Sequence, residues 1–155
     1  MSAEAVLEAL IARGLMLATA ESCTGGMISA AITDVAGSSA AFDRGYVTYT
    51  NAAKTQMLGV AQATLAAHGA VSEEVAREMA AGALERSGAG ITIAVTGIAG
   101  PGGSEHKPEG RVCFGLATTA GTRTETVEFG AIGRAQVRQA SVDHALALVL
   151  AALSD

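Results

Sequence analysis

Short apolar runs alternate along this chain with stretches whose apolar residues recur every three or four positions. The first pattern is typical of buried strands and the second of helices with one buried face. Glycine follows several of the helical stretches, as expected where a helix ends. The patterns predict strands near residues 15–18, 42–48, 90–95, 111–118 and 123–129, and helices near 3–13, 27–36, 52–58, 64–68, 73–83 and 134–153.

The order of these elements predicts the fold class. Helices and strands alternate as far as residue 95, and a short turn around Gly121 joins the last two strands. Such a pair of strands indicates an antiparallel hairpin, whereas alternation of helices and strands indicates parallel pairing. We therefore expect an α/β fold in a single domain over residues 1–155. Its architecture would be a three-layer α/β/α sandwich with a mixed, mostly parallel sheet and a C-terminal hairpin followed by a helix.

The most distinctive polar stretch is residues 19–26, between the first strand and the helix that follows it. It contains Ser22, Thr24 and two successive glycines. Free backbone N–H groups at such a turn can bind an anion or a developing oxyanion, and glycines allow a ligand to approach closely. Ser22 would lie at the carboxyl end of the strand, where ligands bind in open α/β sheets.

A second glycine-rich stretch, residues 96–103, follows the strand at 90–95. It is not a phosphate-binding P-loop, because no Gly-Lys-Ser or Gly-Lys-Thr follows it, and no G-x-G-x-x-G follows the first strand. If the two strands are parallel neighbours, both glycine-rich stretches open at the same edge of the sheet. They would then form a pocket rich in backbone N–H donors, suited to a phosphate or an oxyanion.

Ser22 needs a general base if it is to act as a nucleophile. The three histidines are predicted to lie in a helical turn, a polar loop and the last helix, away from the strand ends. Lys54 is a better candidate, because a lysine that is desolvated in a pocket loses proton affinity. Tyr49 lies five residues earlier and could relay a proton or hold the lysine. The alternative is that Ser22 only caps a helix and Lys54 is a solvated surface charge.

Four further residues have two interpretations each. Cys23 is either a reactive thiol or a small buried side chain, and Glu21 either orients the turn or a substrate group or is a surface carboxylate. Arg134 and Arg138 lie four positions apart on one helix face, where they either clamp a phosphate or remain solvated. No cluster of His, Cys or carboxylate residues has the spacing of metal ligands, so we expect neither a metal nor a cofactor.

Composition narrows the classes of function. Half of the 155 residues are hydrophobic and only 3% are aromatic, so the core must consist of small aliphatic side chains. The net charge of −5 argues against a nucleic-acid surface. No apolar run has the length of a membrane span, no signal peptide is apparent, and two cysteines suit a reducing compartment. These features predict a globular domain in the cytoplasm.

Four motifs resemble those of a known family, the CinA carboxy-terminal domain of competence/damage-inducible proteins. They are AESCTGG at residues 20–26, GYVTYTNAAK at 45–54, GAVS at 69–72 and TGIAGP at 96–101. The resemblance covers residues 7–150. It implies hydrolysis of the carboxamide of nicotinamide mononucleotide to the acid mononucleotide and ammonia, without a metal or cofactor. It also implies self-association into a homo-oligomer, while the acidic charge and the lack of a long apolar run lead us to expect neither nucleic acid nor a membrane as a partner.

The resemblance implies roles for individual residues as well. Ser22 would be the nucleophile, Lys54 its base and Tyr49 an assisting group. The backbone around Thr24 would hold the oxyanion, and residues 96–103 together with Ser39 would line the ribose and phosphate. The implied substrate-binding set is Glu21, Thr24, Gly25, Gly26, Ser39, Tyr46, Asn51, Thr96, Gly97, Gly100, Gly102, Gly103 and Arg138. The Gly-Asp-Arg-x-x-x-Arg pattern of the family is GRAQVR at residues 133–138 here, without the aspartate.

Two other classes of function remain open from the sequence. One is a non-catalytic nucleotide-binding module that keeps the same pocket, and the other is a protein-interaction unit linked to competence or DNA damage. The joint presence of Ser22, Tyr49 and Lys54 favours the enzyme over both, because binding alone does not require such a set.

Overall fold

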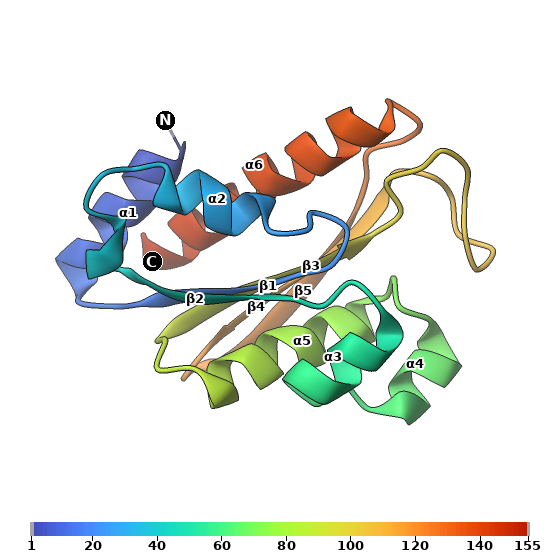
Figure 1. Ribbon diagram of the computed structural model, residues 1–155, viewed down its shortest axis with the longest axis horizontal. Coiled ribbons are helices and arrows are strands. Elements are labelled where there is room, and N and C mark those ends of the chain that lie inside the picture. The colour runs from blue at the N-terminus through green and yellow to red at the C-terminus, as the bar shows by residue number, and fades with distance from the viewer. Residues whose placement is uncertain (1, 155) are drawn as a thin grey trace.

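The computed structural model describes residues 2–154 (Figure 1). The elements, in chain order, are α1 (Ser2–Arg13), β1 (Leu17–Glu21), α2 (Met27–Thr33), the short 3₁₀ helix η1 (Ser38–Ala40), β2 (Phe42–Val47), α3 (Asn51–Leu58), α4 (Gln62–His68), α5 (Glu73–Arg86), β3 (Ile91–Gly97), β4 (Arg111–Thr118), β5 (Gly121–Glu128) and α6 (Arg134–Leu153). Each predicted helix and strand is present. The largest differences are at β1, which begins and ends later than predicted, at α2, which ends earlier, and at α5, which ends later.

The five strands form one mixed sheet in the order β2-β1-β3-β4-β5. β1 pairs in parallel with β2 and β3, whereas β3–β4 and β4–β5 are antiparallel. The mixed sheet and the C-terminal hairpin followed by a helix are thus confirmed. The pairings divide evenly between parallel and antiparallel, rather than being mostly parallel, because β4 returns directly beside β3 and carries β5 with it.

Helices cover both faces of the sheet, which confirms the three-layer sandwich (Figure 1). α1, α2 and α6 pack on one face, where Leu17, Ile93 and Phe114 are fully or almost fully buried. α3, α4 and α5 lie on the other face. There the strands present small residues such as Ala20 and Ala94 to α5. Across residues 2–154, no helix combines the length and apolarity needed to cross a membrane.

Small residues allow α5 to approach its neighbours closely. A Cβ atom on Gly115 of β4 would lie 2.4 Å from the carbonyl oxygen of Ala76 in α5. A Cβ atom on Gly82 of α5 would lie 1.9 Å from the carbonyl oxygen of Leu58, the last residue of α3. A side chain at either position would separate the helix from its neighbour. The abundance of glycine and alanine therefore reflects close backbone packing around α3 and α5.

The connections between the strands leave a possible site at the carboxyl ends of β1 and β3. β1 leads through α2 to β2 over one face, and β2 leads through α3, α4 and α5 to β3 over the other (Figure 1). From the carboxyl end of β1 the chain goes to β2, and from that of β3 it goes to β4, so it leaves these two neighbouring strand ends toward opposite sides of the sheet. In open α/β sheets ligands bind in the crevice at such a switch point. The two predicted glycine-rich stretches follow these two strand ends, as expected for parallel neighbours.

Candidate active site

Ser22 immediately follows β1 and is 7% exposed. Its backbone N–H donates to the carbonyl oxygen of Val95 in β3 at 3.0 Å, so the pairing of the two central strands holds it in place. Its Oγ lies 3.0 Å from Nζ of Lys54. This contact connects residues 32 positions apart and brings together the two predicted catalytic side chains.

Lys54 belongs to α3, whose first turn is capped by the side chain of Thr50. Its side chain is 1% exposed, so it is not the solvated surface charge of the alternative interpretation. Nζ donates to the carbonyl oxygens of Thr48 at 3.1 Å and Tyr49 at 3.2 Å, in addition to Ser22. Burial lowers the pKa of Lys54 from its ordinary value, while the nearby Cys23 and Glu105 act in the opposite direction.

Tyr49 contacts the lysine through its backbone rather than its ring. The ring is 59% exposed, and its hydroxyl accepts a hydrogen bond from Nη2 of Arg134 at 3.2 Å. Arg134 also donates through Nη1 to the carbonyl oxygen of Gly100 at 2.8 Å. Of the two predicted actions of Tyr49, the structure shows that it holds the lysine. The phenol instead lies at the rim of the site with Arg134.

Glu21 was expected to orient the turn or a substrate group, with a surface carboxylate as the alternative, and its contacts agree with orientation of the turn. Its side chain is fully buried and does not line the cavity. The carboxylate accepts hydrogen bonds from the Thr24 hydroxyl at 2.6 Å and from the backbone N–H groups of Gly26, Ile28 and Ser29 at 3.2, 2.9 and 3.0 Å. The Ser29 hydroxyl adds a fifth at 2.9 Å. Glu21 therefore caps the start of α2 and orients the turn.

The turn after Ser22 is held from its other side by Arg138 of α6. Nε donates to the carbonyl oxygen of Cys23 at 3.0 Å and Nη2 to that of Thr24 at 3.3 Å. Among residues 2–154, the backbone N–H groups of Cys23 and Thr24 have no hydrogen-bond acceptor, whereas those of Gly25 and Gly26 donate to Ser22 and Glu21. The free donors of the turn are thus the two that directly follow the serine.

A cavity of about 360 Å³ opens beside Ser22 and Lys54. Eight of the predicted site residues line it: Ser22, Tyr49, Asn51, Lys54, Gly97, Gly100, Gly102 and Gly103. Sequence reasoning did not place Ala70, Val71, Ser104, Glu105 and Arg134 in this wall. The GAVS motif contains Ala70 and Val71, and the spacing of the two arginines singled out Arg134. Ser104 and Glu105 carry no signal in the sequence.

Eight predicted substrate-binding residues do not line the cavity: Glu21, Thr24, Gly25, Gly26 and Arg138, which belong to or hold the turn, and Ser39, Tyr46 and Thr96. Ser39 is exposed in η1, beside the start of β2 and thus at the opposite end of the parallel strands. Tyr46 packs its ring against the core formed by β1, α3 and α5. Thr96 is buried, and its hydroxyl donates to the carbonyl oxygen of Ala70 at 2.9 Å. Thr96 and Tyr46 support neighbouring segments in this chain, and neither reaches the cavity.

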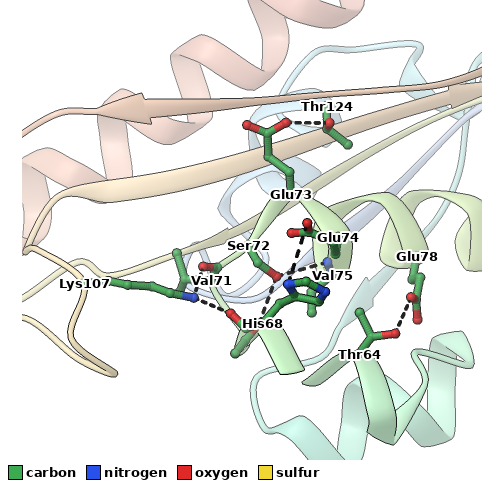
Figure 2. A network of polar contacts seen from close by, with 11 residues as sticks. Thr64, His68, Val71, Ser72, Glu73, Glu74, Val75, Glu78, Lys107 and Thr124 are labelled. Carbon is green, nitrogen blue, oxygen red and sulfur yellow. Dashed lines mark hydrogen bonds and ion pairs between the residues drawn. The ribbon is translucent and has the colours of Figure 1, made fainter. Parts of the chain in front are cut away.

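The long loop between β3 and β4 forms the outer wall of the cavity, and two charged side chains anchor it. Lys107 donates through Nζ to the carbonyl oxygens of His68 and Val71, each at 2.5 Å, between α4 and α5 (Figure 2). Glu109 accepts from the backbone N–H of Gly102 at 2.7 Å. Both contacts lie behind the wall, so they set its position without facing the cavity.

Cys23 lines the cavity as well, and its thiol is not activated. Burial raises the pKa of Cys23 to about 11. A thiol with such a pKa stays protonated at neutral pH and is a poor nucleophile. Of the two interpretations of Cys23, the buried side chain agrees with the structure.

Comparisons with known proteins agree with this architecture. The model of the CinA C-terminal domain family matches residues 1–153. The chain is 53% identical over 144 residues to the nicotinamide-nucleotide amidohydrolase PncC of Escherichia coli K12, covering 92% of this chain and 87% of that protein. It is 53% identical over 156 residues to a putative competence-damage inducible protein of Symbiobacterium thermophilum, covering 94% of this chain and 36% of that protein.

A solved structure is similar throughout. The crystal structure of the competence damage-inducible protein A (ComA) from Klebsiella pneumoniae superposes with a TM-score of 0.95 at 43% identity, over 99% of this chain and 95% of that one. The chain spans about a third of the length of the curated CinA-like and competence-damage inducible relatives it matches. It follows from the family match, from these identities and from the shared fold that the chain belongs to the CinA C-terminal domain family.

Proposed function

We propose that this protein hydrolyses the carboxamide of nicotinamide mononucleotide, releasing nicotinate mononucleotide and ammonia. The relatives named nicotinamide-nucleotide amidohydrolase support the substrate, since they are 53–60% identical to this chain. The observation that carries the proposal is the buried pair of Ser22 and Lys54, with Oγ and Nζ 3.0 Å apart at the wall of a cavity. Self-association and a cytoplasmic location remain predictions from the sequence.

The three contacts of Lys54 favour a base directed at Ser22. The carbonyl oxygens of Thr48 and Tyr49 can only accept hydrogen bonds, so they bind two N–H groups of the amine. In the neutral amine the remaining position is a lone pair, and it faces the Ser22 hydroxyl. Burial lowers the pKa of Lys54, which raises the fraction of the neutral form at a given pH. Lys54 can therefore accept the proton as Oγ attacks.

Amide cleavage then proceeds in two stages. Ser22 Oγ forms a bond to the carboxamide carbon, its proton passes to Lys54, and the carbonyl oxygen becomes an oxyanion. The protonated Lys54 gives its proton to the leaving nitrogen, the C–N bond breaks, and ammonia departs from an acyl-enzyme. Water attacks the ester with Lys54 again as the base, which releases the acid and regenerates Ser22. Each step uses the same pair of side chains.

The remaining wall suits the rest of a mononucleotide. Arg134 reaches the cavity rim between Tyr49 and Gly100, where a guanidinium can pair with a phosphate. The exposed Tyr49 ring provides an aromatic surface at the same rim. The glycines at 100, 102 and 103 allow a ligand to approach the backbone. We assign the phosphate to Arg134 rather than Arg138, because Arg138 is occupied with the turn and does not line the cavity.

The test is an assay of ammonia and nicotinate mononucleotide with purified protein, nicotinamide mononucleotide and a chelator. We expect turnover by the natural sequence, and a loss of roughly 10⁴-fold or more in kcat for both Ser22→Ala and Lys54→Ala. Cys23→Ser is the matched control, because Cys23 adjoins the nucleophile and its thiol is not activated; it should retain most activity.

Two results would contradict the proposal. Full activity in Ser22→Ala would show that another group is the nucleophile. Absence of turnover by well-folded natural protein, with nucleotide binding retained in calorimetry, would instead favour a non-catalytic binding module.

A further inference from the structure

Arg138 makes contacts that substrate binding does not explain. It extends from α6, one residue after the fully buried Val137, and its side chain lies half-buried against the turn that follows Ser22. Its Nε and Nη2 donate to the carbonyl oxygens of Cys23 and Thr24, at 3.0 and 3.3 Å. Arg138 does not line the cavity, although Arg134, one helical turn earlier, does. The two arginines therefore serve different parts of the site.

The Cys23 carbonyl that Arg138 holds determines where the N–H of Thr24 points, because the two groups belong to one peptide unit. A peptide unit is planar and trans, so its C=O and N–H point in opposite directions. Binding the carbonyl of Cys23 to Arg138 on the α6 side directs the N–H of Thr24 away from α6. Neither that N–H nor the N–H of Cys23, whose own peptide unit Arg138 does not contact, donates to another residue among residues 2–154. Both directly follow the proposed nucleophile, where acyl-transfer enzymes place donors for the oxyanion.

The charge of Arg138 adds to this orientation. A guanidinium on a carbonyl oxygen draws electron density through the peptide, so the N–H of the same unit becomes a stronger donor. On the opposite side of the turn, Glu21 binds the N–H groups of Gly26, Ile28 and Ser29. The turn is thus held by a cation on its carbonyl groups and by an anion on its later N–H groups, which leaves the two N–H groups after Ser22 free.

We infer that Arg138 is a positioning residue for the oxyanion site: it orients and polarises the backbone N–H of Thr24 through the peptide unit that this N–H shares with the Cys23 carbonyl, and it does not bind the substrate. This role rests on the proposed amide hydrolysis. Arg138 acts on the transition state only, because the oxyanion forms only when Ser22 has attacked. Its loss should therefore lower kcat and leave the binding of substrate and product unchanged.

The test compares Arg138→Met with Arg134→Met in steady-state kinetics and in ligand binding. The first ligand is the mononucleotide in which an aldehyde replaces the carboxamide. Ser22 Oγ adds to the aldehyde carbon, its proton passes to Lys54, and the former carbonyl oxygen becomes an oxyanion at the proposed donors. The second ligand is nicotinate mononucleotide, which carries the same ribose and phosphate but is not attacked by the serine.

For Arg138→Met we expect kcat to fall by about 10- to 100-fold, less than the 10²- to 10³-fold typical of losing an oxyanion donor itself. KM and the affinity for nicotinate mononucleotide should stay within about 2-fold of their values in the natural protein, because Arg138 does not bind the substrate or the product. The affinity for the aldehyde should fall by the same factor as kcat. Arg134→Met should raise KM and weaken both ligands equally, with kcat retained. Arg138→Lys should recover part of kcat, because one ammonium replaces a two-pronged donor.

The outcomes separate this inference from the proposed function. If the natural protein releases no ammonia, the proposed function fails, and the role of Arg138 fails with it. If the natural protein is active, and Arg138→Met either keeps its kcat or weakens the aldehyde and the acid equally, only the role of Arg138 is overturned. Should the methionine variant not fold, Arg138→Lys gives the same comparison. The amide NMR signal of Thr24 must also move in the folded variant; an unchanged signal contradicts the inference without any assay of turnover.

Discussion

The two glycine-rich segments at the carboxyl ends of β1 and β3 are similar in composition and different in how they are held. The turn at residues 22–26 is short and mostly buried, and Glu21 and Arg138 bind its backbone and the start of α2 from two sides. The loop at residues 98–110 is longer, is exposed over residues 101–106, and is anchored from behind by Lys107 and Glu109.

This difference corresponds to two tasks in the proposed reaction. A nucleophile and the donors for an oxyanion must stay within a fraction of an ångström of one geometry, which requires contacts that leave the backbone no alternative. A wall that encloses a nucleotide must instead admit and release it, which suits an exposed segment with few anchors. Similar sequence patterns therefore support chemistry in one segment and enclosure in the other.

The largest expected effect comes from removing the buried anchor of the turn. In Glu21→Gln an amide replaces a carboxylate that accepts five hydrogen bonds, and its NH₂ group meets N–H and O–H donors. Buried donors then lose their partners, so the free energy of unfolding should fall by roughly 2–4 kcal/mol. Urea denaturation measures it. Glu109→Gln, the matched change behind the loop, should cost less than about 1 kcal/mol. Equal losses of unfolding free energy in the two variants would show that the two segments are held equally firmly.

A second prediction concerns the pH dependence of the chemistry that the turn supports. Lys54 must be neutral to accept the proton of Ser22, and burial lowers its pKa. The acid limb of kcat/KM should therefore rise about tenfold per pH unit and level off at a pH below the ordinary lysine pKa of about 10.4. A limb that levels off at or above that value would exclude Lys54 as the base.

The loop should respond through binding rather than chemistry. Lys107→Met removes two hydrogen bonds that hold the wall against the carbonyl groups of His68 and Val71 (Figure 2). We expect KM to rise by roughly 3- to 10-fold with kcat nearly unchanged, since only uniform binding is weakened. Lys107→Arg should restore much of the loss. A fall in kcat at constant KM would show that the loop takes part in the chemistry.

The smallest effect is on stability as a function of pH. Because folding lowers the pKa of Lys54, the unfolded chain binds one proton more between the folded pKa and the ordinary value. The unfolding free energy should therefore rise with pH in that window, more steeply than in Lys54→Met, and the penalty should be complete below the folded pKa. Urea denaturation at a series of pH values measures the difference in slope. Parallel curves would mean that the lysine pKa does not change on folding.

Much of this molecule is predictable from local pattern. The spacing of the apolar residues and the positions of the glycines predicted every helix and strand, because these signals act over a few residues. We predicted that the glycine-rich segments after β1 and β3 open at the same edge of the sheet. This followed from the parallel pairing that is expected of alternating helices and strands. The choice of Lys54 over the histidines followed from the chemistry of a desolvated amine and from its position after a strand end.

Other features depended on how distant segments pack. Whether Glu21 faces solvent or the start of α2 depends on the pleat of β1 and on where α2 docks, so its residue type alone left both interpretations open. Ser39 was expected in the site, yet η1 lies at the far end of the strands.

The two arginines show the limit most clearly. Spacing by four places Arg134 and Arg138 on one face of α6, and the sequence determined no more than that. The docking of α6 against the turn decided that Arg138 binds the carbonyl groups of Cys23 and Thr24 while Arg134 reaches the cavity. The sequence by itself determined the elements and led to the proposed catalytic pair, because local periodicity and residue chemistry are encoded over short distances. Only the tertiary structure decided which polar groups face one another, because that depends on contacts between residues more than a hundred positions apart.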